Sequence, residues 1–131
     1  MTKREVLKST VPTTGLPYAQ AIRVGDLVFV AGQVALDPAT GQAMAGDVTA
    51  QTERVIGNIK GILESAGTSL ANAVENICFL ADARRDFAEF NAVYSKYWDT
   101  TGPVRTTVQA VLPREGLLVE IRCLAAMPVE D

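Results

Sequence analysis

The sequence predicts an α+β domain in which two helices cover one face of a mixed β-sheet. Three observations support this prediction: strand and helix signals alternate, each helix signal has a single apolar stripe, and no linker or repeat interrupts the chain. A length of 131 residues is typical of one domain with its own core. We therefore expect residues 1–131 to form a single domain.

Two β-rich runs near the N-terminal end predict a hairpin. The runs are YAQAIRV and LVFVAGQ, and Gly25-Asp26 lies between them. A turn centred on that pair places Tyr18 opposite Gln33 and Gln20 opposite Ala31. These four side chains are then expected on one face of the sheet.

A long amphipathic helix is predicted over Val48–Ala66, after a turn-rich loop over residues 36–41 (LDPATG). Asp47 is the expected N-cap, and Gly67 suits the left-handed position that follows the last turn. The apolar stripe has helical spacing and contains Val48, Thr52, Val55, Ile56, Ile59, Ile62, Leu63 and Ala66.

The second half of the chain predicts a strand, a helix and a second hairpin. The strand is expected over Ala73–Ala81, and the helix begins at Asp86, with Glu89 three residues later as in a capping box. The stripe of this helix is mostly aromatic: Phe87, Phe90, Asn91, Tyr94, Tyr97 and Trp98. The hairpin joins Val104–Leu112 to Leu117–Met127 around residues 113–116 (PREG).

Composition excludes several classes of function. Twelve Lys and Arg against fifteen Asp and Glu give a net charge of −3, which argues against a nucleic-acid or anionic-membrane partner. The absence of histidine removes Ser-His-Asp and Cys-His catalysis, and two cysteines are too few for a zinc cluster, so no metal site is expected. The N-terminal stretch MTKREVLKST lacks the apolar core of a signal peptide, so none is expected. No apolar run is long enough to span a bilayer. We expect a cytoplasmic protein.

Two charged residues in the second hairpin are candidates for ligand chemistry. Arg105 lies at the start of a strand, where its guanidinium can hold a carboxylate by two parallel bonds; the alternative is a solvated charge at a sheet edge. In the predicted hairpin Arg105 pairs near Leu124, so Glu120 shares its face about 13 Å along the strand. That gap leaves room for a small carboxylate and one water. The alternative for Glu120 is a cross-strand pair with a surface charge such as Arg122.

Other polar residues allow two interpretations each. Asn91 interrupts the aromatic stripe and either contacts a ligand or satisfies a backbone group. Tyr18 either offers its hydroxyl at the mouth of a pocket or covers the end of the sheet. Cys78 and Cys123 alternate with apolar residues and are most simply buried thiols.

Several segments together resemble one known family. In order and spacing, the chain is similar to the RidA/YjgF-type reactive-intermediate deaminases from about Leu16 to Ala126. The segments that carry the likeness are GLPYAQAIRVGDLVFVAGQ, DPATG, QTERVIGNIKGILESAG, FNAVYSKYW, GPVRTTVQAVLP and VEIRCLA.

The resemblance implies a fold and an activity. It implies a chorismate-mutase-like α+β fold, a homotrimer with clefts between subunits, and no cofactor. It also implies hydrolysis of 2-imino acids and their enamine tautomers, such as 2-aminoacrylate/2-iminopropanoate and 2-iminobutanoate, to 2-keto acids and ammonia. Removing these intermediates protects pyridoxal-phosphate-dependent enzymes. The matched catalytic positions are Arg105, which holds the substrate carboxylate, and Glu120, which positions the attacking water.

The resemblance also assigns substrate-binding positions. Tyr18 and Asn91 match cleft positions of the family, and Gly32 matches the backbone bend beside the imine. The chain departs from the family at Ala31, where a serine is common, and at Thr107, where a cysteine is common. These departures bear on substrate preference and rate more than on the reaction.

Three other functions compete with this one. A non-enzymatic 2-keto-acid-binding or regulatory module would use the same arginine. A related deaminase would act on another enamine in a catabolic pathway. A ribonuclease or translation inhibitor is disfavoured, because the chain is acidic and lacks histidine.

Overall fold

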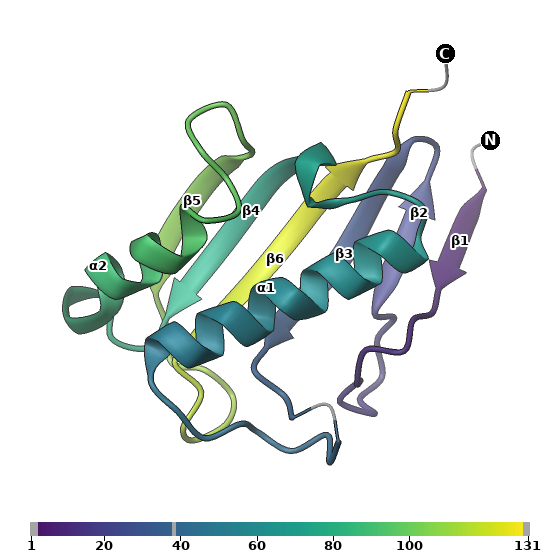
Figure 1. The fold of residues 1–131 in the computed structure, drawn as a ribbon. Coiled ribbons are helices and arrows are strands. Elements are labelled where there is room, and N and C mark those ends of the chain that lie inside the picture. The colour runs from purple at the N-terminus through teal and green to yellow at the C-terminus, as the bar shows by residue number, and fades with distance from the viewer. Residues whose placement is uncertain (1–2, 38, 130–131) are drawn as a thin grey trace.

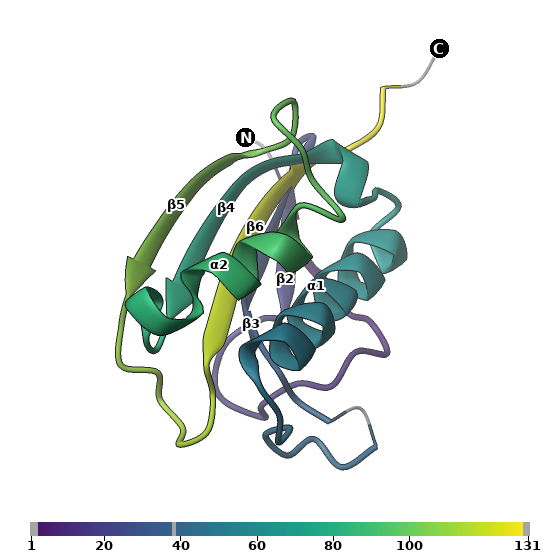
Figure 2. The same cartoon turned by 60° about the vertical axis from the view of Figure 1, so that its left-hand side comes forward.

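The computed structural model describes residues 3–37 and 39–129, which form an α+β fold, so the predicted fold class is confirmed (Figure 1). Both helices lie on the same face of a six-stranded sheet, as Figures 1 and 2 show. The elements are β1 (Arg4–Leu7), β2 (Ala21–Val24), β3 (Leu27–Val34), α1 (Val48–Ser65), a 3-10 turn (Leu70–Asn72), β4 (Ala73–Leu80), α2 (Ala83–Tyr94), β5 (Val104–Gln109) and β6 (Val119–Ala126). The four-residue strand β1 was not predicted.

The order of the strands in the sheet is β1-β2-β3-β6-β4-β5. Strand β4 pairs with β5 in parallel and with β6 antiparallel, so it lies between the two strands that we expected to form a hairpin. The predicted second hairpin is therefore wrong. The physical reason is that α2 carries the chain back along the sheet, and this β4–α2–β5 crossover places β5 parallel to β4 at the sheet edge.

The first hairpin is confirmed at its turn and wrong further along. Val24 pairs with Leu27 across a turn in which Gly25 has φ +59°, and the Ala31 amide donates to the Gln20 carbonyl at 2.8 Å. A register shift between Val30 and Gln33 then pairs Gln33 with Ile121 of β6. Because β2 begins only at Ala21, Tyr18 lies outside the strands and not opposite Gln33.

Helix α1 matches its prediction closely. The Asp47 side chain accepts a hydrogen bond from the Ala50 amide at 2.9 Å, and Gly67 has φ +90° after the last turn. The predicted stripe is buried against the sheet from Val48 to Leu63, while Ala66 is the C-cap. In the preceding loop Gly41 donates to the Asp37 carbonyl, and Pro38 lies outside the described residues.

Helix α2 begins earlier than predicted. Asp82 is its N-cap and accepts from the Arg85 amide at 3.1 Å, whereas the Asp86 carboxylate receives the Arg85 guanidinium at 2.9 Å. The predicted capping box at Asp86 is thus wrong, because a second capping residue lies one turn earlier, directly after β4. The helix ends at Tyr94, so Tyr97 and Trp98 lie in the turns that follow it.

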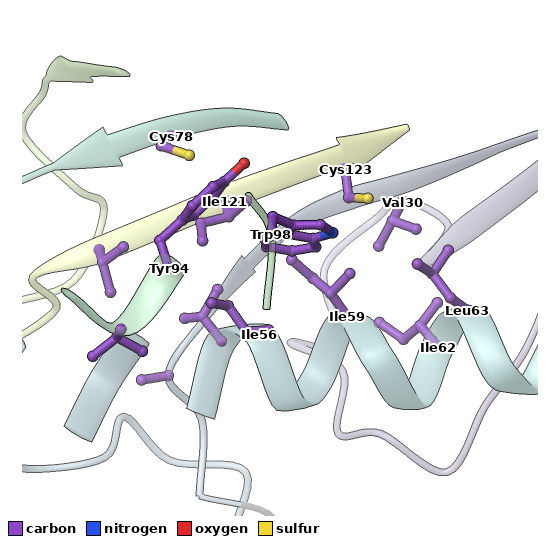
Figure 3. Close-up of a cluster of buried hydrophobic side chains, with 14 of the residues drawn as sticks. Val30, Ile56, Ile59, Ile62, Leu63, Cys78, Tyr94, Trp98, Ile121 and Cys123 are labelled. Carbon is purple, nitrogen blue, oxygen red and sulfur yellow. The ribbon is translucent and has the colours of Figure 1, made fainter. Parts of the chain in front are cut away.

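The core lies between the helices and one face of the sheet (Figure 3). Ile56, Ile59 and Leu63 of α1 are fully buried there, as is Ile121 of β6, and the buried Trp98 packs on Tyr94 of α2. The opposite face of the sheet carries no helix in the described part of the chain. No helix among the described residues has the length and apolarity that crossing a membrane requires.

Candidate functional site

Arg105 lies on the helix-covered face of β5, at the edge of the sheet. Its guanidinium donates to Asn91 Oδ1 of α2 at 2.8 Å. The guanidinium carbon lies 4.7 Å from the ring centre of Tyr94, 5.4 Å from that of Phe90 and 5.8 Å from that of Phe87. Aromatic faces attract cations, so these three rings form a platform on which the guanidinium is held.

The groups around the guanidinium are neutral. Burial raises the pKa of the nearby Cys78 thiol to about 12, and burial also raises the pKa of Tyr94. Thr107 follows Arg105 on the same face, and its hydroxyl oxygen is buried without a hydrogen-bond partner among the described residues. None of the ion pairs among the described residues includes Arg105. The half-buried cation therefore stays available to an anionic ligand, which argues against the solvated-edge interpretation.

Glu120 lies on β6 between two residues that are buried beneath the helices. Val119 and Ile121 point into the core, so Glu120 points to the face of the sheet that carries no helix. Burial raises its pKa above the ordinary value of 4.5. The alternative pair with Arg122 is not formed, because Arg122 pairs with Glu75 at 3.6 Å.

The Glu120 carboxylate lies against the backbone of Gly32. A Cβ atom at Gly32 would lie 2.5 Å from Glu120 Oε2, a separation that van der Waals radii forbid. Gly32 sits in the stretch where the β3–β6 register shifts. The bulge and the missing side chain together let the carboxylate approach the strand, with Ala31 directly before it.

Gly32 also borders a cavity of about 390 Å³ between β3 and the N-terminal segment. The half-exposed Tyr18 lines this cavity, and its hydroxyl accepts a hydrogen bond from the Thr14 hydroxyl at 2.8 Å. Gly32 thus links Tyr18, which lines the same cavity, with Ala31, which precedes it, and Glu120, which packs against it. We call these four residues the glutamate half-site. Arg105, Asn91 and Thr107 form the arginine half-site.

The two half-sites lie on opposite faces of the sheet. Arg105 is in register with Asn76 of β4, and Asn76 is in register with Cys123 of β6. Cys123 and Glu120 are three residues apart on β6, and an odd separation turns side chains to opposite faces. The prediction that Arg105 and Glu120 share a face is therefore wrong, because it depended on the hairpin that β4 interrupts. One chain does not bring these residues to one ligand.

Sequence reasoning missed part of the arginine half-site. Phe87, Phe90 and Tyr94 were predicted only as members of the aromatic stripe of the helix, and their role as a platform for a cation was not predicted. Asn76 was not considered. It alternates with the buried Cys78 and Leu80 along β4, and a polar residue at such a position is visible in the sequence. The described residues place no group of three metal-binding side chains together.

Comparison with known proteins identifies the family. The model of the family described as Endoribonuclease L-PSP matches residues 9–127. The chain belongs to this family, the RidA/YjgF family. The predicted resemblance is thereby confirmed.

Relatives of the RidA/YjgF family match nearly the whole chain. A RutC family protein of Pyrococcus abyssi, PYRAB12510, is 42% identical over 125 residues, which cover 95% of this chain and 98% of the relative. RidA of the Antarctic bacterium Psychrobacter sp. PAMC 21119 is 35% identical with a TM-score of 0.86, covering 94% and 99%. TdcF of E. coli, solved with bound serine, is 30% identical with a TM-score of 0.86, covering 95% and 99%.

Proposed function

We propose that the protein hydrolyses 2-imino acids and their enamine tautomers, such as 2-iminopropanoate and 2-iminobutanoate, to 2-keto acids and ammonia. The observation that carries the proposal is the complementarity of the half-sites. One presents an uncompensated guanidinium that suits a carboxylate, and the other presents a carboxyl group whose pKa is raised by burial. Each chain has one of each on opposite faces, so two copies meeting at these faces complete a site.

The sheet face without a helix supports assembly of several copies. Phe29, Val104 and Val108 lie on this face with 43%, 66% and 44% of their surface exposed. Apolar side chains gathered on one face are typical of an interface. We propose a homotrimer in which this face is covered by neighbouring copies and the Glu120 of one chain meets the Arg105 of another. Three equivalent clefts result.

The proposed reaction uses one water and no cofactor. The Arg105 guanidinium binds the substrate carboxylate by two parallel bonds and fixes the neighbouring C2 atom. Glu120 accepts a proton from a water whose oxygen bonds to C2, while the C=N electron pair moves to nitrogen. Glu120 then returns its proton to the carbinolamine nitrogen. The hydroxyl oxygen re-forms the carbonyl as the C–N bond breaks, and its proton passes to Glu120 and from there to the departing ammonia. The raised pKa brings Glu120 closer to neutrality, where proton acceptance and return are both efficient.

A relative supports the class of ligand. TdcF of E. coli was solved with bound serine, a small molecule in which a carboxylate adjoins a nitrogen-bearing carbon. The 2-imino acids have the same arrangement of groups. Removal of such reactive intermediates would protect the pyridoxal-phosphate-dependent enzymes that release them.

Two of the three alternative functions use less of the structure. A 2-keto-acid-binding module needs the arginine half-site alone and gives no reason for Glu120 to lie against Gly32. A deaminase acting on a catabolic enamine would use the same half-sites and differ only in its substrate. A ribonuclease has no support in a chain with net charge −3 and no histidine, despite the name of the family model.

The test is ammonia release from freshly generated 2-iminopropanoate, measured above the spontaneous rate. The proposal predicts hydrolysis by the parent protein that Arg105→Ala and Glu120→Gln each reduce strongly. Binding of pyruvate without accelerated ammonia release would instead establish the keto-acid-binding module.

A further inference from the structure

The Arg105 platform is supported from beneath by a buried polar residue of β4. Asn76 is fully buried, and its amide nitrogen donates to the Tyr94 hydroxyl at 3.0 Å. The other side-chain atom of Asn76, Oδ1, has no hydrogen-bond partner among the described residues. Because a hydroxyl both donates and accepts, the contact with Tyr94 persists in either orientation of the amide.

A buried asparagine is an unfavourable choice for packing alone. A buried amide with one polar atom unsatisfied is less favourable than an apolar side chain of similar size. The neighbours of Asn76 on the same face of β4, Cys78 and Leu80, are apolar in character and fully buried. The single hydrogen bond to Tyr94 is therefore the contact that distinguishes Asn76 from an apolar residue there.

Tyr94 is the nearest of the three rings to the guanidinium. Its ring centre lies 4.7 Å from the Arg105 carbon, against 5.4 Å for Phe90 and 5.8 Å for Phe87. The ring packs on Phe90 at 5.7 Å and on Trp98 at 4.8 Å, which restrict its tilt. Figure 3 shows the ring extending from α2 toward the sheet. The Asn76 bond holds the hydroxyl end of the ring, so the position of the Tyr94 ring beneath the guanidinium depends on it.

Arg105 needs such a platform because its own polar anchoring is slight. Within the described part of the chain, its hydrogen bond is to Asn91 Oδ1 on one side of the guanidinium. The remaining N–H groups are available to a ligand. A guanidinium that grips a carboxylate by two bonds must keep its plane oriented, and the ring beneath it sets that plane.

We propose that Asn76 is a positioning residue for the carboxylate-binding Arg105, acting through the hydroxyl and ring of Tyr94. This inference rests on the proposed function, in which Arg105 holds the substrate carboxylate. Asn76 itself touches no substrate. Its effect is on the alignment of the guanidinium and hence on the affinity for the carboxylate.

The test is a double-mutant cycle of Asn76→Leu, Tyr94→Phe and the double variant. The readouts are the Kd for pyruvate by calorimetry and the kcat and KM for 2-iminopropanoate. Losing one hydrogen bond is expected to raise Kd and KM about five- to tenfold in each single variant. The kcat should change little, because the carboxylate contact is the same in substrate and transition state. The double variant should match the single variants, since both remove the same contact.

Thr52→Val is the matched control. Thr52 is also fully buried and donates one hydrogen bond, to the Val48 carbonyl within α1, a helix that carries no residue of either half-site. This control should leave Kd and KM unchanged, whatever it does to the melting temperature.

The outcomes separate the two claims. A lower melting temperature in Asn76→Leu with unchanged Kd and KM would show a purely structural role and overturn the inference. If the increases in Kd and KM of the two single variants multiply in the double variant, Asn76 and Tyr94 act independently, and this would also overturn the inference. A parent that binds pyruvate but releases no ammonia overturns the proposed function, while the Kd values still decide the role of Asn76. A parent protein that does not bind pyruvate would overturn both the proposed function and the role of Asn76.

Discussion

Arg105 and Glu120 extend from opposite faces of one sheet, with β4 between the strands that carry them. Each residue sits in an environment suited to its proposed task. The arginine lies on aromatic rings without a compensating acid, and the glutamate is packed against a glycine backbone. Both tasks belong to one reaction only if two chains meet, so the proposed function and the proposed assembly depend on each other.

Replacing Arg105 by lysine should fail almost as badly as replacing it by alanine. A lysine keeps the charge but cannot form two parallel bonds to a carboxylate. Charge-assisted hydrogen bonds contribute roughly 1.5–3 kcal/mol each, so kcat/KM should fall at least about a hundredfold in both variants. Imine hydrolysis measures the loss, and a melting curve shows whether the fold survives. Parental activity in Arg105→Ala would remove Arg105 from the reaction.

Adding one methyl group at Gly32 should disrupt the glutamate half-site. In Gly32→Ala the new Cβ would meet Glu120 Oε2 at 2.5 Å, so the carboxylate must move away from the strand. Because misplacement of a general base costs about 10²-fold, kcat should fall by that order.

Gly57→Ala is the control for this substitution. Gly57 lies in α1 and has no atom within 4 Å of the position of a Cβ, so the alanine fits freely. The variant should gain up to about 1 kcal/mol of stability from helix propensity and keep its activity. Equal activity in Gly32→Ala and Gly57→Ala would show that the contact between Gly32 and Glu120 is unimportant.

The raised pKa of Glu120 predicts opposite effects of Glu120→Gln on activity and stability. Glutamine cannot accept a proton, so turnover should fall about 10²–10⁴-fold while pyruvate still binds. Burial disfavours the ionised carboxylate, so the parent loses stability as the pH rises through the folded-state pKa, which lies above 4.5. The variant should therefore melt higher than the parent at pH 7, and this advantage should disappear below pH 4.5.

The pH dependence of catalysis should report the same group. In the parent, kcat/KM should decline as the pH falls through the raised pKa of Glu120, because the general base becomes protonated. The residual activity of Glu120→Gln should lack this decline. The stability prediction for Glu120→Gln has its own contradicting result: a melting temperature below that of the parent at pH 7 would show that burial does not disfavour the ionised Glu120.

Local signals predicted the helical parts of the fold well. Helix α1 was predicted to within one residue, because Asp47, Gly67 and the apolar stripe all lie within one segment. The start of α2 was misplaced because Asp82 and Asp86 are both capable of capping, and only the end of β4 decides between them. Boundaries set by a neighbouring element were thus less predictable than the elements themselves.

The pairing of distant strands was not predictable from local signals. β5 and β6 are consecutive and each reads as a strand, which favoured a hairpin, but the crossover through α2 places β4 between them. This one error moved Glu120 to the wrong face. Arg105 and Glu120 were predicted as site residues from their chemical type and from family resemblance. Their placement on opposite faces of the sheet could be seen only in the structure. The departure of Tyr18 from its predicted pairing likewise required the structure, because β2 begins only at Ala21.

Subunit complementation tests the central claim most directly. Arg105→Ala and Glu120→Gln chains, each with its own tag, are co-expressed, and trimers carrying both tags are purified and assayed for 2-iminopropanoate hydrolysis. If each site takes Arg105 from one chain and Glu120 from the next, every trimer that contains both variants has one intact site, so about a third of its sites are rebuilt. The mixed protein should then recover about that fraction of parental activity, although each variant alone is nearly inactive. Mixed trimers as inactive as the separate variants would contradict a site shared between chains.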